Sequence, residues 1–175
     1  APSAAALQRF VTEAASIERL QAVVVSHRGE PLLAERFRGP APERQVNVKS
    51  VSKTLVAALT GAALHEGVLD SVRRNLGELA PSLVPAGADA RVGTLTIEDL
   101  LTMRAGLERT SGANYGAWVS SADWVSDALG RHMGGNQMVL SPLELARIGA
   151  LYLNGGTVGT RRVFAADWIE TSFTP

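Results

Sequence analysis

The hydrophobic positions along the chain predict several amphipathic helices and a single pair of strands. Short apolar runs rich in β-branched residues, 21–25 and 32–37, predict two strands that a tight turn joins into a hairpin. Apolar residues at helical spacing predict helices at 4–17, 51–66, 121–129, 141–153 and 166–173, and one that starts at Thr96 and ends before Gly106. A lone hairpin is marginally stable, so helices of this number would normally cover a larger sheet.

Capping residues mark where these helices begin and end. Ser141, Pro142 and Glu144 form the strongest start signal in the chain, because a serine followed three residues later by glutamate is a capping box. Gly67 is a suitable C-terminal cap for the helix over 51–66. The segment 68–95 contains proline and glycine and is predicted to be mostly loop.

Composition narrows the class of protein and of partner. A length of 175 residues with 46% hydrophobic residues fits one domain with a packed core. Seventeen basic residues balance seventeen acidic ones, which argues against a nucleic-acid or anionic-membrane partner. No apolar run is long enough to span a membrane. Cysteine is absent, which excludes disulfides, thiolate metal sites and a cysteine nucleophile. The compartment stays open, with a periplasmic or secreted location favoured over the cytoplasm.

The candidate chemistry lies at the start of the second predicted helix, in the stretch "NVKSVSKTLVAAL". Both lysines of the chain, Lys49 and Lys53, flank Ser50 there, and every other basic residue is arginine. Ser50 and Lys53 are three residues apart, which places them on one helix face. A serine hydroxyl needs a base beside it to act as a nucleophile, and an arginine guanidinium cannot accept a proton. On spacing alone, a solvated lysine at a helix start explains the pattern as well.

Other constellations in the sequence give weaker signals. No serine lies in a G-x-S-x-G motif, and no lysine lies in a glycine-rich phosphate loop. His27, His65 and His132 are isolated from one another along the chain and are interpreted as structural. We therefore expect no metal and no cofactor.

Three blocks in one order resemble the class C β-lactamase-like serine hydrolases: "SVSKTLVAALTGAALHEGVLD", "LTIEDLLTMRAGL" and "GGNQMVLSPLELARIGALYLNGG". This group includes β-lactamases, DD-peptidases, family VIII esterases and 6-aminohexanoate-dimer hydrolases. The resemblance implies an α/β fold in which helices and a helical region flank an antiparallel sheet. It also implies that Ser50 forms an acyl-enzyme, that Lys53 serves as its base and that the Ser50 N–H supplies half of an oxyanion hole. Tyr115 and Asn136 would contact the substrate.

The chain also departs from the family pattern. A tyrosine motif expected between the "DWV" and "GG" blocks is absent, and a third motif, K-T-G or H-x-G, does not appear before Pro175. Tyr152 matches Y-x-N as text, but it stands where the family has a packing residue. We predict one incomplete domain over 1–175, with an α/β part at 1–66 and 141–175, a helical part at 67–140 and a missing segment near 129–130. A second chain or a further segment would complete it.

The sequence thus predicts a serine hydrolase that acts on a small ester, amide or β-lactam through an acyl-enzyme. The alternative is a catalytically incomplete remnant that keeps the Ser50 helix and serves as a binding or scaffold protein.

Overall fold

The structure is a computed structural model that describes residues 2–106 and 138–174. The chain divides into two compact units. The first unit combines Ala1–Ser52 with Ser120–Arg162, and the second combines Lys53–Val119 with Val163–Pro175.

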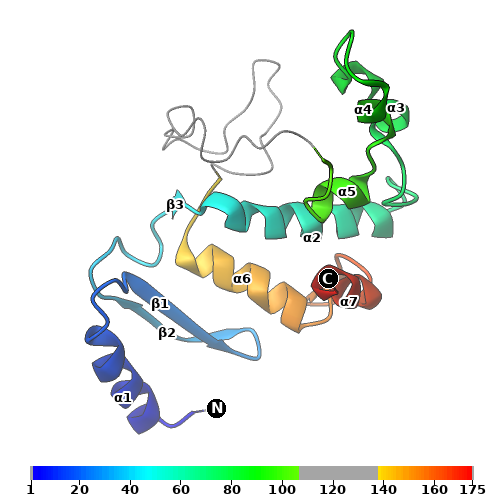
Figure 1. Ribbon diagram of the computed structural model, residues 1–175. Coiled ribbons are helices and arrows are strands. Elements are labelled where there is room, and N and C mark those ends of the chain that lie inside the picture. The colour runs from blue at the N-terminus through cyan, green and yellow to red at the C-terminus, as the bar shows by residue number, and fades with distance from the viewer. Residues whose placement is uncertain (1, 107–137, 175) are drawn as a thin grey trace. The chain divides into compact units, whose positions relative to one another are not determined.

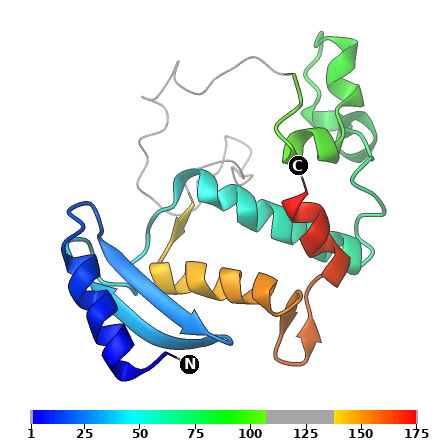
Figure 2. The ribbon, with the colours of Figure 1, turned by 60° about the horizontal axis from the view of Figure 1, so that its bottom comes forward.

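The centre of the first unit is the predicted hairpin, formed by β1 (Ala22–His27) and β2 (Glu30–Arg36). Arg28 and Gly29 join the strands, and both have positive φ angles of 55° and 86°, as a two-residue hairpin turn of type I′ requires. Helix α1 (Ala4–Ala15) lies on one side of the hairpin and α6 (Pro142–Leu153) on the other (Figures 1 and 2). The hairpin and both helices confirm the sequence-based predictions.

A second, shorter strand pair was not predicted. Strand β3 (Val46–Asn47) pairs antiparallel with β4 (Val139–Leu140), with Val46 opposite Leu140. Two residues in each strand give no periodicity, and the partners are far apart in sequence, so only tertiary packing could reveal the pair. Directly after β4, Ser141 caps α6, and the first unit continues into a small hairpin of β5 (Thr157–Val158) and β6 (Arg161–Arg162).

In the second unit, α7 (Ala166–Phe173) packs against α2 (Ser52–His65), most of which belongs to this unit. The Trp168 indole N–H donates to the Ala57 carbonyl at 3.1 Å, and Trp168 is only 9% exposed. The end of α2 is a Schellman motif, because the Gly67 N–H donates to the Leu64 carbonyl and the Val68 N–H donates to the Ala63 carbonyl. The predicted Gly67 cap is therefore confirmed, with a φ angle of 69°.

The segment 68–95 is more ordered than predicted. It contains three short helices, α3 (Leu76–Leu79), η2 (Pro81–Leu83) and α4 (Ala90–Thr94), where we expected mostly loop. Helices of three to five residues are too short to show a 3.6-residue period, which explains the error. The next helix, α5 (Ile97–Leu101), begins directly after Thr96, as predicted, and ends at Leu101, earlier than predicted. A capping box between Thr96 and Asp99, which was not predicted, marks its start.

The capping box of α6 gives a pH-dependent prediction. The Ser141 N–H donates to the Glu144 carboxylate at 2.7 Å, and this bond, with the serine hydroxyl, lowers the pKa of Glu144 below its usual value of 4.5. A carboxyl group whose pKa is lowered by folding stabilises the protein at pH values above its unfolded-state pKa. That stabilisation is lost as the pH falls through the pKa of the folded state. We therefore expect Glu144→Gln to unfold at a lower urea concentration than the parent near pH 7, with a small difference. As the pH falls well below 4.5 the difference should shrink. An equal difference at both pH values would contradict this role.

Candidate active site

Ser50 lies in a 3₁₀ turn, η1 (Lys49–Val51), that runs directly into α2. Strand β3 ends at Asn47, so the turn follows the β3–β4 pair by only one residue. The Val48 N–H donates to the Met138 carbonyl at 2.9 Å, which extends the contact between these two segments. Ser50 is therefore held on a short helical start that a strand pair anchors.

The turn that carries Ser50 is exposed, and a buried residue lies on each side of it. Val48 is 8% exposed and Ser52 is fully buried, whereas Lys49, Ser50 and Val51 are exposed. The two buried residues fix the turn at both ends because moving either would open packed contacts. Ser50 lies between these two buried residues and is exposed at the surface.

The turn contains an unusual backbone conformation at Lys49. Its φ angle is 51°, in the left-handed region that non-glycine residues seldom adopt. The Lys49 N–H donates to the Asn47 side-chain oxygen at 2.9 Å, an Asx-turn that holds the chain in this shape. Asn47 thus supports the residue that immediately precedes Ser50.

Relief of this strain is testable. Glycine adopts positive φ without steric cost, whereas alanine meets the same clash as lysine. We expect Lys49→Gly to be more stable than Lys49→Ala by up to about 1 kcal/mol, even after the greater backbone entropy that glycine has in the unfolded chain. Equilibrium urea unfolding of the two variants measures the difference. If Lys49→Ala were the more stable, the left-handed conformation would not be strained.

Lys53 lies in the first turn of α2 and is half-buried. It has an interaction within the protein, as does Ser50. The boundary between the two units falls between Ser52 and Lys53. The pairing of the Ser50 hydroxyl with the Lys53 amine therefore stays a prediction from their spacing.

The remaining predicted residues divide into two groups. Tyr115, Asn136, His132 and the expected discontinuity near 129–130 all lie outside the described residues. Tyr152 is described and sits near the end of α6. A helical rise of about 1.5 Å per residue puts it roughly 15 Å along the axis from Pro142, which follows the β3–β4 pair. Tyr152 thus lies at the opposite end of α6 from the β3–β4 pair, and its interpretation as a packing residue stays a prediction.

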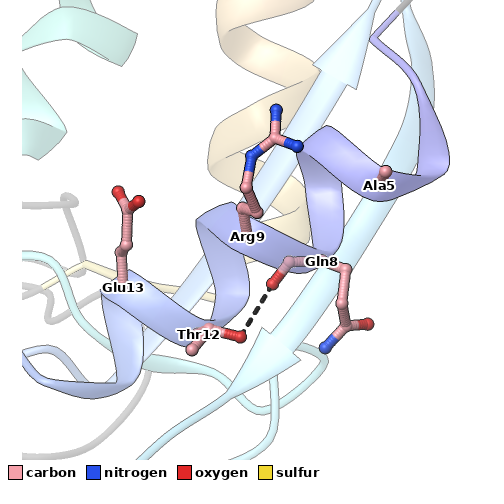
Figure 3. Close-up of a pocket in the computed structure, with 5 residues that line it drawn as sticks. All are labelled: Ala5, Gln8, Arg9, Thr12 and Glu13. Atoms are coloured by element: carbon pink, nitrogen blue, oxygen red, sulfur yellow. Dashed lines mark hydrogen bonds between the residues drawn. The ribbon is translucent and has the colours of Figure 1, made fainter.

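A shallow hollow lies along α1, but it has no features of a site. Its volume is about 340 Å³, and Figure 3 shows its lining residues, Ala5, Gln8, Arg9, Thr12 and Glu13. All five come from one helix, and the Thr12 hydroxyl donates to the Gln8 carbonyl at 3.0 Å within it. Within residues 2–106 and 138–174, no cluster of His, Cys, Asp or Glu could hold a metal ion.

Comparison with known proteins identifies the family. The Beta-lactamase family model matches residues 14–133, more than half of the chain. The chain belongs to the Beta-lactamase family. Family members are hydrolases, and this assignment confirms the resemblance of the sequence blocks around Ser50. No curated protein matches the chain.

Two solved structures share the fold. "Putative 6-aminohexanoate-dimer hydrolase from Bacillus anthracis" matches with a TM-score of 0.68 and 13% identity, over 94% of this chain and 61% of that one. "Crystal structure of putative beta-lactamase from Bacteroides dorei DSM 17855" matches with a TM-score of 0.62 and 13% identity, over 98% and 69%. These matches confirm the predicted fold class. The chain spans less than two thirds of the length of the first of them.

No helix in the described part of this family member is long and apolar enough to cross a membrane.

Proposed function

We propose that the protein is a serine hydrolase in which Ser50 attacks the carbonyl of a small ester, amide or β-lactam. The observation that carries the proposal is the presentation of Ser50. It is exposed between the buried residues Val48 and Ser52, at the helical start where the family's serine-lysine block lies.

The reaction has two halves. The Ser50 hydroxyl oxygen forms a bond to the carbonyl carbon, and the Lys53 amine takes the hydroxyl proton. The bond to the leaving alcohol or amine then breaks, and the leaving group receives that proton. Water next attacks the acyl-enzyme, and the acid is released as Ser50 regains its proton. Backbone N–H groups at the start of a helix stabilise the negative charge that develops on the carbonyl oxygen.

Lys53 is a better candidate for the base than Lys49. Residues three apart on a helix have Cβ atoms about 5–6 Å apart, within reach of a lysine amine. Lys49 instead precedes Ser50 in the strained turn, where it is exposed. Lysine also differs from arginine in that it can give up its proton, which a base must do.

The substrate side of the proposal rests on two further residues. We propose that Tyr115 and Asn136 contact the substrate, because their sequence context is similar to that of the esterase and linear-amide hydrolases of this family. The sequence context of these two residues favours a linear ester or amide slightly over a lactam as the substrate.

A second candidate function rests on the tyrosine motif of the family. The sequence between the "DWV" and "GG" blocks does not contain it. A non-catalytic protein that binds a partner through this fold would fit that pattern. A second chain or a further segment would then complete the domain.

A covalent serine probe distinguishes these functions. The protein is incubated with a fluorophosphonate, digested, and the labelled peptide is identified by mass spectrometry. A hydrolase should carry the label on Ser50, while Ser26, which is also exposed, provides an internal reference for non-specific labelling. Absence of label on Ser50, or equal labelling of Ser26, would refute the nucleophile and favour the binding protein. The intact mass and the oligomeric state, measured on the same sample, show whether another chain is present.

A further inference from the structure

A hollow in the first unit gathers positive charge. Its volume is about 650 Å³, and three arginines, Arg36, Arg38 and Arg44, are among the residues that line it. We call this hollow the arginine pocket. No aspartate or glutamate is among the lining residues that the structure describes. The chain as a whole has a formal net charge of zero, so this concentration of cations is local.

The backbone that follows β2 and lines the pocket is held by hydrogen bonds to Gln21. The Gln21 carbonyl accepts hydrogen bonds from three successive N–H groups, those of Phe37, Arg38 and Gly39, at 2.8 to 3.2 Å. Gly39 lies so close to Gln21 that an added Cβ would overlap its side chain. The segment that carries Arg38 therefore has a defined path, and its arginine is not on an open loop.

Arg38 is further fixed by its own side chain. Its guanidinium donates to the Ile17 carbonyl at 2.9 Å and to the Ala15 carbonyl at 2.7 Å, at the end of α1. A guanidinium has five N–H donors, so these two bonds hold it in place and leave donors for a ligand. Both acceptors are neutral carbonyl groups, and Arg38 forms no ion pair with any residue that the structure describes.

The other two arginines resemble Arg38 in this respect. Within residues 2–106 and 138–174, neither Arg36 nor Arg44 forms an ion pair. Glu35 precedes Arg36 in β2, and successive strand residues point to opposite faces of a sheet. The Glu144 carboxylate accepts hydrogen bonds from the Ser141 N–H at 2.7 Å and from the side chain of Gln45, a residue that lines the pocket, but it forms no ion pair with Arg36 or Arg44 in the described part of the chain. Three like charges that share one hollow repel each other, and a bound anion would remove that repulsion.

We propose that the arginine pocket binds a small multivalent oxyanion, the group shared by phosphate esters and polycarboxylates. Arginine forms paired hydrogen bonds with both kinds of anion, and these charge-assisted bonds are stronger than neutral ones. Gln21, Gln45 and Asn47 are polar residues that also line the pocket. Asn47 belongs to β3 and precedes Ser50 by three residues. An anion bound in the pocket would therefore contact the same chain segment that carries Ser50. The site does not depend on the chemistry of Ser50.

Isothermal titration with inorganic phosphate and, separately, with citrate tests the proposal at constant ionic strength. We expect saturable binding of at least one anion. The Arg36→Gln/Arg44→Gln double variant should weaken it about tenfold or more, because each charge-assisted bond contributes strongly. The control is Arg19→Gln/Arg73→Gln, which removes the same charge at exposed positions outside the pocket. This control should bind as the parent does.

Each outcome bears on the proposal. Stronger binding of phosphate identifies a phosphate ester as the ligand class, and stronger binding of citrate identifies a polycarboxylate. If the glutamine variant does not fold, as judged by circular dichroism, Arg36→Lys/Arg44→Lys replaces it, and a weakening that the control lacks supports the paired geometry. Absence of saturable binding by the parent overturns the proposal. Equal weakening in the control and in the pocket variant overturns it also, because a general positive field would then explain the binding.

Discussion

Lys53→Arg is expected to lower the rate of Ser50 acylation by about 10²–10⁴-fold, the range that general acid-base groups contribute. Arginine keeps the positive charge and a long side chain, but it cannot accept the serine proton at neutral pH. The reduction should appear in the rate of labelling by a fluorophosphonate and in the hydrolysis of an activated ester. Ser50→Ala sets the lower limit, since it removes the attacking oxygen.

Lys49→Arg is the matched control for this result. It makes the same substitution four residues earlier, on the other side of Ser50, and should leave the acylation rate close to that of the parent. Circular dichroism of each variant checks that the fold is retained. A Lys53→Arg protein that reacts at the parental rate would exclude Lys53 as the base. An equal loss in both variants would show that arginine disturbs the turn itself.

Gly61→Ala is expected to destabilise the second unit by about 1–3 kcal/mol, the typical cost of overpacking. Gly61 lies in α2 against Trp168 of α7, and an added Cβ would overlap Cδ1 and Nε1 of the indole ring. Trp168 cannot move freely, because it is buried and its N–H bonds to the Ala57 carbonyl at 3.1 Å. The free-energy cost of this clash should exceed the stabilisation of roughly 1 kcal/mol that alanine gives over glycine inside a helix.

Gly149→Ala separates the clash from that helix preference. Gly149 lies inside α6, and a Cβ added there meets no atom of the described residues within 4 Å. This variant should be more stable than the parent by roughly 0.5–1 kcal/mol. Urea unfolding of both variants gives the comparison. If Gly61→Ala were stabilised to the same degree as Gly149→Ala, then α7 would not be packed on α2 as the structure shows.

The elements that sequence reasoning predicted correctly are those whose signals are local. The hairpin of β1 and β2 follows from two β-branched runs and a turn, and α6 follows from the Ser141–Glu144 box and the apolar period after it. Gly67 likewise ends α2 through bonds within the last turn. Errors occurred where the elements were too short to show a period, as in the helices between 68 and 95.

The sequence by itself determined the family, the start of α6 and Ser50 as the candidate nucleophile, because each depends on residues that are close together in the chain. Only the tertiary structure decided how Ser50 is presented. Val46 and Leu140 lie far apart in sequence, yet their pairing anchors the turn that holds Ser50. The burial of Val48 and Ser52, with Ser50 exposed between them, is a property of packing that no local pattern contains. The gathering of three arginines and Gln21 around one hollow arises in the same way, from contacts made when separate segments fold together.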